Sequence, residues 1–155
     1  MPSKTYSFEV TRTSTAKPET LFRLETDGAR WSDWAKPLVL QSSWRDEGDP
    51  APGGVGAIRQ VGAWPLLLSE QTIVYEPPHR HVYTFTGPGA PANDYRGEVL
   101  FTPNDAGGTD LCWRGSFTEA VRGSGPVVRR LLLTAITFLS ARLVHAAERE
   151  ERGRG

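Results

Sequence analysis

Arg59 and Glu70 are the first residues whose types and spacing could do chemistry. They lie in two neighbouring apolar segments, 55–62 and 66–75, which are separated by a turn at residues 63–65. If these segments form a strand hairpin, the two charges face each other. Pointing inward, they could hold a hydroxyl or carboxylate of a ligand, or act as weak candidate catalytic groups. Pointing outward, they form a surface ion pair of little energetic value. The residue alternation leaves both orientations open.

The sequence gives little support for a metal site, a catalytic nucleophile or a cofactor-binding motif. His79 and His81 have a His-x-His spacing, but they flank a proline turn and a third ligand would have to come from His145 or a carboxylate, so no metal site is predicted. Cys112 is the single cysteine and has no adjacent histidine to activate it. The glycines of APGGVG precede a predicted strand rather than a helix. We therefore expect no cofactor.

The composition narrows the class of protein. Lys plus Arg and Asp plus Glu are both 18, so the zero net charge gives no electrostatic reason to expect a nucleic-acid partner. The opening MPSKTYSFEV lacks the apolar core of a signal peptide, and one cysteine cannot form an intrachain disulfide, so a cytoplasmic location is expected. The longest apolar stretch, 131–147, is interrupted by polar residues and falls short of the ~20 apolar residues of a membrane span.

The elements that must position these residues follow from apolar periodicity. Residues 5–12 alternate as a half-buried strand, and Pro18 opens a short helix over 18–25, which is followed by WSDW as a second short helix. A long helix should start at RGSGP, capped by Ser124, and end near Arg149, with 147–155 as a frayed tail. Six further strands are predicted between them, at 38–45, 55–62, 66–75, 81–86, 95–102 and 109–119. Strands joined by short turns predict an antiparallel sheet, in an α+β single domain over 1–155.

The segment DYRGEVLFTPNDAGGTDLCWRGSF gives the clearest strand register. Pairing Phe101 with Leu111 places Gly97 opposite Gly115 and Glu98 opposite Arg114. One face is then apolar and aromatic, and carries Tyr95, Gly97, Val99, Trp113, Gly115 and Phe117. Two facing glycines each cost roughly 0.5–1 kcal/mol in strand interiors, so they need a reason. One alternative is that the glycines only let the sheet bend around the long helix. The other is that they let it bend and also leave an unfilled space for a ligand.

We expect the second alternative to create an aromatic ligand cavity. A rough register for the neighbouring strand places Tyr83 beside Gly97, and Phe85 should share its face. The long helix presents an apolar stripe that must bury against the sheet, and includes Leu132, Ala135 and Leu139. Such walls suit a flat or ring-containing apolar molecule. The competing interpretation is a filled aromatic core without a cavity. The helix is also apolar on a second side at 131–133, which is compatible with a homodimer contact.

The ordered set WSDW, GVGAIR, EPPHRHVYTF, DYRGEVLFTP, GGTDLCWRGSF and a GSGP-initiated helix resembles the START-like (SRPBCC, Bet v 1-like) superfamily. The similarity spans residues 6 to about 147 and is greatest to the bacterial polyketide cyclase/dehydrase and lipid-transport branch. It implies a helix-grip fold, with about seven curved antiparallel strands around the C-terminal helix and a cavity between them. It also implies that the short helices form a cavity mouth, where Trp34 would lie.

Three functions remain open at this point. The first is a carrier or sensor that binds a small hydrophobic molecule, such as a lipid, a polyketide or an aromatic compound. The second is a cyclase or dehydratase that uses the same cavity and needs a general acid or base there, with Arg59 and Glu70 as the charged candidates. The third is a protein-interaction module with exposed Trp31, Trp34 or Trp64.

Overall fold

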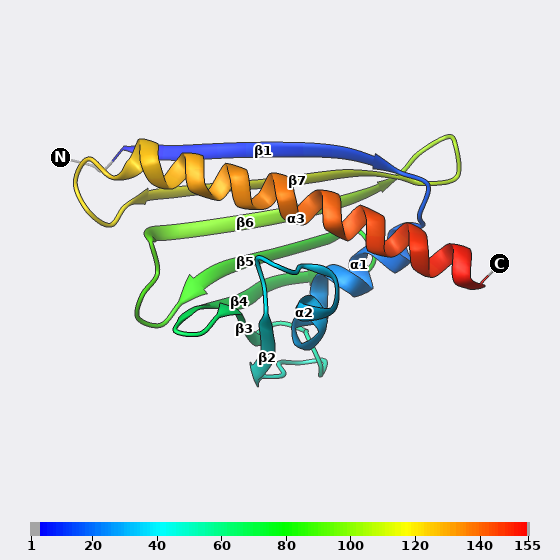
Figure 1. Ribbon diagram of the computed structural model, residues 1–155, viewed down its shortest axis with the longest axis horizontal. Helices are drawn as coiled ribbons and strands as arrows, with labels where there is room; N and C mark the ends of the chain where they lie inside the picture. Colours follow the sequence, from blue (N-terminus) through cyan, green and yellow to red (C-terminus); the bar gives the residue numbers. More distant parts are fainter. Residues whose placement is uncertain (1–3, 155) are drawn as a thin grey trace.

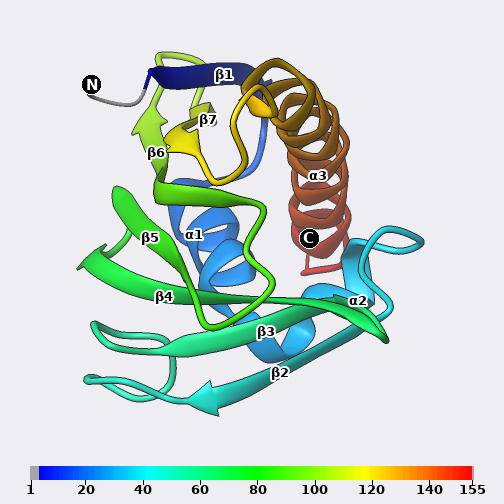
Figure 2. The same cartoon turned by 90° about the vertical axis from the view of Figure 1, so that its left-hand side faces the viewer.

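The computed structural model describes residues 4–154 as one antiparallel sheet that curves around a long C-terminal helix (Figures 1 and 2). The strand order is β1-β7-β6-β5-β4-β3-β2, so the first strand pairs with the last. Figure 2 shows the sheet turning from β1 beside the helix to β2 on the far side. The strands are β1 (Thr5–Ser14), β2 (Gln41–Asp46), β3 (Ile58–Ala63), β4 (Leu66–Glu76), β5 (Arg80–Thr86), β6 (Ala92–Pro103) and β7 (Thr109–Glu119). The predicted helix-grip α+β fold is confirmed.

Three α-helices and one 3-10 turn complete the fold: α1 (Pro18–Thr26), η1 (Gly28–Arg30), α2 (Trp31–Trp34) and α3 (Gly125–Arg154). The start of α3 differs in detail from the prediction. The Glu119 carboxylate accepts the Gly125 N–H at 2.7 Å, while the Ser124 hydroxyl donates to the Val121 carbonyl instead of capping the helix. None of the described helices is long and apolar enough to cross a membrane.

The C-terminal segment is docked where fraying was expected. The α3 helix continues through Arg154, and Ala147 has no exposed surface. Glu148 accepts hydrogen bonds from the Ser14 hydroxyl at 2.8 Å and the Thr15 N–H at 3.2 Å. Glu151 accepts the N–H of Lys17, the residue that precedes α1, at 2.7 Å. These carboxylates satisfy backbone donors near the start of α1, so the end of α3 is fastened to it; Gly155 lies outside the described residues.

The β6–β7 register is the predicted one over most of its length. Gly97 pairs with Gly115, and Glu98 pairs with Arg114. The ladder shifts between Asn93 and Arg96, so the expected direct pairing of Tyr95 with Phe117 is replaced by a bulge.

The glycines do not leave an empty space. A Cβ on Gly97 would lie 2.5 Å from Cζ of Tyr83, and a Cβ on Gly115 would lie 2.5 Å from Cζ of Phe8. The missing side chains therefore make room for aromatic rings of the neighbouring strands β5 and β1. The same inner face holds the completely packed side chains of Val99, Trp113 and Phe117, which have at most 1% of their surface exposed.

The inner side of α3 buries Ile136, Leu139 and Leu143 against the sheet and α1. Leu131 belongs to the predicted second apolar side at 131–133 and is 65% exposed. The stripe that packs against the core includes Val128 and, one turn later, Leu132, both partly buried.

Candidate functional site

A cavity of about 510 Å³ lies between strands β3 to β6, the segment after α2, and α3. Its wall is almost entirely apolar, and Glu70 is the single charged side chain among the described residues that form it. Leu38 and Leu66 line it while being 44% and 82% exposed, so they form its solvent-facing rim. The remaining wall consists of Trp31, Val39, Val61, Gly62, Ala63, Pro65, Leu67, Leu68, Tyr83, Phe85, Pro88, Gly89, Tyr95, Leu132, Ala135, Ile136 and Leu139.

The structure brings half of the sequence-predicted ligand residues to this cavity. Those in the wall are Tyr83, Phe85, Tyr95, Leu132, Ala135 and Leu139. Six lie outside it. Gly97 and Gly115 are covered by the rings of Tyr83 and Phe8, and the other four are buried core residues: Val99, Trp113, Phe117 and Trp34. The cavity is therefore shifted from the β6–β7 hairpin toward β3 and β4.

Trp34 lies behind the cavity rather than at its mouth. Its ring is 5.0 Å from the Trp31 ring, and both tryptophans are at least 95% buried. Burial of both side chains removes them from any exposed docking surface, whereas Trp64, in the β3–β4 turn, is 77% exposed.

Arg59 and Glu70 adopt the inward orientation. They pair across β3 and β4, and Arg59 Nε donates to Glu70 Oε1 at 2.8 Å. The guanidinium is 3% exposed and stacks between two aromatic rings, with Cζ 4.1 Å from the Trp31 ring centroid and 5.0 Å from that of Tyr83. Arg59 thus contacts three residues of the cavity wall, which are Trp31, Glu70 and Tyr83, without lining the cavity itself.

Glu25, His81 and Thr72 extend this ion pair into a buried network that the sequence analysis missed. Arg59 Nη1 donates to the Glu25 carbonyl at 2.6 Å and to Glu25 Oε2 at 3.0 Å. The same carboxylate lies 2.8 Å from His81 Nδ1, and His81 Nε2 lies 2.9 Å from Thr72 Oγ1. The network therefore runs from the cavity wall at Glu70 to Thr72 in the core.

Sequence spacing carried a signal for Glu25 and His81. Glu25 follows Leu21 and Phe22 by four and three positions, so on a helix it shares their buried face. His81 precedes Tyr83 by two positions and therefore points to the same side of β5. His81 is 1% exposed whereas His79 is exposed in the turn before β5, so the two imidazoles occupy different environments.

Glu25 and Arg59 keep their charges despite burial. Burial raises the pKa of Glu25, but the charges of His81 and Arg59 and the hydrogen bonds from both outweigh it, and the pKa ends below the ordinary value. Burial lowers the pKa of Arg59, but Glu70 and Glu25 more than compensate and raise it. A buried ion-pair system of this kind is strongly destabilised when one partner is removed.

The phenols of the cavity stay neutral. Burial raises the pKa of Tyr83 well above its ordinary value and raises that of Tyr95 as well. The Tyr83 hydroxyl accepts the Trp113 Nε1–H at 3.0 Å, which fixes the ring at the cavity wall. The polar end of the cavity therefore offers one ion-paired carboxylate and two neutral hydroxyl groups.

Two buried donors lack a hydrogen-bond partner among the described residues: Arg59 Nη2 and Trp34 Nε1. Each such group costs roughly 1–3 kcal/mol when it is left unsatisfied. Both belong to side chains that pack against Trp31, so the region behind the cavity is less completely satisfied than the rest of the core.

Comparisons with known proteins agree with this architecture. The chain is similar in structure to an uncharacterized protein from Bacillus thuringiensis, with TM-score 0.72, 16% identity, and 91% of this chain and 98% of that chain covered. It is also similar to Ara h 8.0201, with TM-score 0.68, 17% identity, and 92% and 97% covered. A third similar structure is the di-domain ARO/CYC BexL from the BE-7585A biosynthetic pathway, with TM-score 0.68, 19% identity, and 95% and 50% covered. Identities this low establish the shared fold alone.

No curated protein matches the sequence. The model of the family described as "Polyketide cyclase / dehydrase and lipid transport" matches residues 5–148, which is nearly the whole chain.

Proposed function

Because this chain belongs to the polyketide cyclase/dehydrase and lipid-transport family, within the SRPBCC superfamily, we propose that it binds one small hydrophobic molecule in the cavity under α3, as a carrier or sensor. The observation that carries the proposal is the nearly apolar cavity of about 510 Å³, a size in the usual range of small-molecule sites. Each Å² of apolar ligand surface that the cavity removes from water contributes about 25 cal/mol to the free energy of binding.

The charge of the wall indicates an uncharged ligand. Glu70 is the one charged group that the described wall presents, so a carboxylate or phosphate placed at the polar end would meet a like charge in a dry environment. A ligand hydroxyl or carbonyl could instead bond with Glu70 or with the phenols of Tyr83 and Tyr95. Lipid-, polyketide- and aromatic-like molecules with few polar groups all satisfy this condition.

A cyclase or dehydratase is the second candidate, and the place of Glu70 in the wall is the observation that favours it. A carboxylate that contacts the ligand could act as a general base. Two features favour the carrier instead. Glu70 Oε1 already accepts a hydrogen bond from Arg59 Nε at 2.8 Å, so this oxygen is engaged within the protein rather than with a ligand. The raised pKa values of Tyr83 and Tyr95 keep both phenols protonated, so neither supplies a phenolate as general base.

A pair of matched helix variants tests binding. Ala135 lines the cavity, whereas Ala141 is exposed on the same helix. We expect Ala135→Trp to fill the cavity and abolish the fluorescence increase of the neutral probe N-phenyl-1-naphthylamine. Ala141→Trp should bind the probe like the unchanged protein. Equal probe binding by all three proteins, each with an intact circular-dichroism spectrum, would place the probe elsewhere and refute the proposal.

Glu70→Gln separates carrier from enzyme. It preserves the shape of the side chain while removing the carboxylate that a general base requires. A carrier should retain its ligand, identified by mass spectrometry of denatured, freshly purified protein. An enzyme should lose turnover of a polyketide-like substrate and accumulate the bound substrate instead. Loss of all ligand from this variant, with a circular-dichroism spectrum equal to that of the unchanged protein, would contradict both versions, because neither makes the carboxylate the main source of binding energy.

A further inference from the structure

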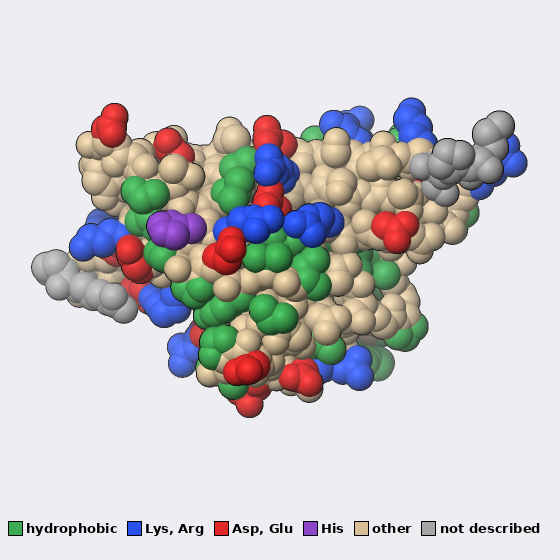
Figure 3. All heavy atoms as spheres, turned by 180° about the vertical axis from the view of Figure 1, so that it is seen from behind, with side chains coloured by type: hydrophobic (Ala, Val, Ile, Leu, Met, Phe, Trp, Pro, Cys, Tyr) green, Lys and Arg blue, Asp and Glu red, His purple; other side chains and the backbone are tan. Residues whose placement is uncertain are grey.

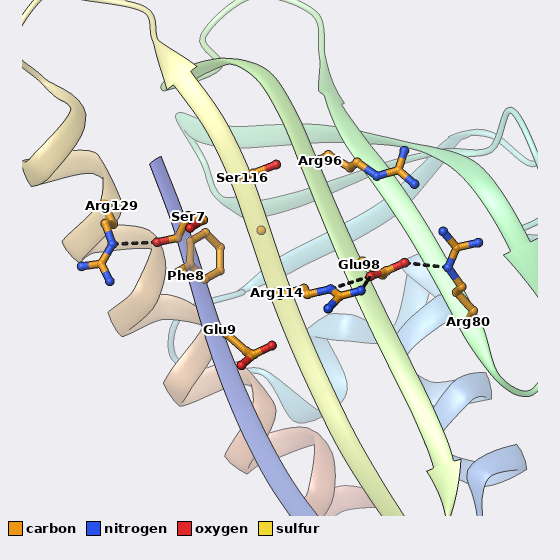
Figure 4. A pocket seen from close by; sticks show the side chains of 10 residues that line it. Ser7, Phe8, Glu9, Arg80, Arg96, Glu98, Arg114, Ser116 and Arg129 are labelled. Carbon is orange, nitrogen blue, oxygen red and sulfur yellow. Dashed lines mark hydrogen bonds and ion pairs between the residues drawn. The ribbon is translucent and has the colours of Figure 1, made fainter. Parts of the chain in front are cut away.

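A second hollow, of about 840 Å³ and open to solvent, lies on the outer face of the sheet, remote from the apolar cavity. We call it the arginine hollow; it is lined by Ser7, Phe8, Glu9, Arg80, Arg96, Glu98, Arg114, Gly115, Ser116 and Arg129. Figure 3 shows the side of the molecule opposite to the view of Figure 1, where Lys and Arg side chains gather around acidic ones near the middle. Figure 4 shows the hollow from close by.

Short side chains form part of its floor. Ser7 on β1 pairs with Ser116 on β7, and Ser116 pairs with Arg96 on β6. These three residues therefore lie in one row across neighbouring strands, with their side chains on the outer face. Neither serine hydroxyl has a hydrogen-bond partner among residues 4–154, so both are free to donate to a bound molecule.

Two of the arginines are fixed in place by one carboxylate. Glu98 Oε2 accepts from Arg80 Nε at 2.6 Å, and Glu98 Oε1 accepts from Arg114 Nε at 2.6 Å (Figure 4). Arg80 Nη1 also donates to Glu76 Oε1 at 3.3 Å, and Arg114 Nη2 also pairs with Glu98. Arg80 Nη2 and Arg114 Nη1 therefore remain as the available donors of these two guanidinium groups. A shared glutamate thus holds two cations on one side of the hollow and lowers the entropy they would lose on binding.

The other two arginines retain free donors as well. Arg129 on α3 donates its Nε–H to the Ser7 carbonyl at 2.7 Å, which brings the guanidinium to the edge of β1 and leaves its Nη groups free. Arg96 is exposed and makes no hydrogen bond or ion pair with any described residue; in Figure 4 its guanidinium lies on the same side of Glu98 as that of Arg80. Exposed arginines of this kind can turn toward a ligand at little cost.

The charge balance favours an anion. Four arginines and two glutamates line the hollow, and Glu76 pairs with Arg80 from outside it, which leaves a local excess of one positive charge on a chain whose net charge is zero. Fork-shaped guanidinium donors match tetrahedral oxyanions in geometry, and hydroxyl groups add directional donors.

We propose that the arginine hollow binds a phosphomonoester group, as a site separate from the apolar cavity. A phosphate dianion has enough acceptor oxygens to bond with several arginines and both serines at once, whereas a single carboxylate has only two oxygens. The hollow is far larger than a phosphate group, so its remaining volume holds the organic part of the ligand. That organic part belongs either to a soluble phosphorylated metabolite or to the headgroup of an anionic lipid.

Matched arginine variants test this site. Arg96→Gln and Ser116→Ala change the hollow, whereas Arg45→Gln and Arg152→Gln remove exposed arginines elsewhere; the three arginine variants alter the net charge equally. Calorimetric titration with glycerol 1-phosphate should show about tenfold weaker binding for Arg96→Gln, the loss expected for one charge-assisted contact. The two control variants should stay within about twofold of the unchanged protein. The Ser7 and Ser116 amide signals should shift in NMR spectra during the titration.

Two outcomes would overturn the proposal. Equal weakening by all three arginine variants would mean that net charge alone attracts the probe. Absence of binding by the unchanged protein, both to glycerol 1-phosphate and to phosphatidylcholine vesicles that contain phosphatidic acid, would leave the site without a ligand. Binding to the soluble probe alone assigns the site to a metabolite, and Arg96-dependent binding to the vesicles alone assigns it to a lipid headgroup.

Discussion

Replacing Gly97 by alanine tests the packing that defines the sheet side of the ligand cavity. The new Cβ would lie 2.5 Å from Tyr83 Cζ and 2.8 Å from its hydroxyl oxygen. Ordinary contact begins at 3.4 Å, so the ring must move by roughly 1 Å. The ring is held by a hydrogen bond from Trp113, by His81 with a centroid distance of 5.5 Å, and by the Arg59 guanidinium. Little room remains for that movement.

The expected loss of stability follows from these contacts. Overpacking of a filled core costs about 1–3 kcal/mol, and the smaller entropy of alanine in the unfolded chain offsets about 0.4–1 kcal/mol of that. The net destabilisation of about 1–2 kcal/mol should lower Tm by about 2–8 °C for a domain of this size. Because Tyr83 also lines the cavity, its displacement should weaken binding of N-phenyl-1-naphthylamine.

Differential scanning calorimetry and probe titration measure both effects. Gly153→Ala is the matched control, because nothing lies within 4 Å of its new Cβ on the last turn of α3; its Tm should stay constant or rise. In a Tyr83→Leu background the clash partner is gone, so Gly97→Ala should lose most of its cost. An unchanged Tm and unchanged probe affinity for Gly97→Ala would refute the packing argument.

Three further predictions concern ionisation. The folded-state pKa of Glu25 is lowered, so its contribution to stability is complete above the ordinary value of 4.5 and is lost as the pH falls through the lower folded value. The urea concentration at the midpoint of unfolding should therefore decrease on acidification. Glu25→Gln should make that decrease smaller. The raised pKa values of Tyr83 and Tyr95 stabilise the fold below the ordinary value of 10.0 and lose that effect above it, so phenolate absorbance at alkaline pH should rise in step with unfolding; a full phenolate signal from the folded protein would contradict this. Burial and the hydrogen bond to Glu9 raise the pKa of Cys112 to about 11 from 9.0, so at pH ~8 its reaction with dithionitrobenzoate should be about a hundredfold slower than in denaturant, and equal rates would show a normal thiol.

The fold could be predicted because strand periodicity and turn residues are local signals. The β6–β7 register followed from matching an apolar face with a face that carries Glu98 opposite Arg114. A one-residue shift would have put those charges among the aromatic side chains. The bulge near Asp94, which has φ of 50°, could not be predicted because the alternation continues through it unchanged.

The candidate site was harder to predict, because it depends on contacts between distant segments. Two facing glycines looked like a gap, yet their space is taken by the rings of Tyr83 and Phe8 from neighbouring strands. Glu25 was overlooked because an acidic residue on a short helix is usually exposed, and its partners Arg59 and His81 lie on two other elements. Only the curved sheet brings these three residues together.

The pairing of the first strand with the last has a consequence for synthesis on the ribosome. Thr5 of β1 pairs with Thr118 of β7, and the helix that covers the apolar face follows later still. At about 5–20 residues per second, β1 waits about 5–20 s for its partner. The inner face of the sheet is uncovered during that time, so the nascent chain completes folding only after α3 has emerged, and until then its apolar surface is exposed to water.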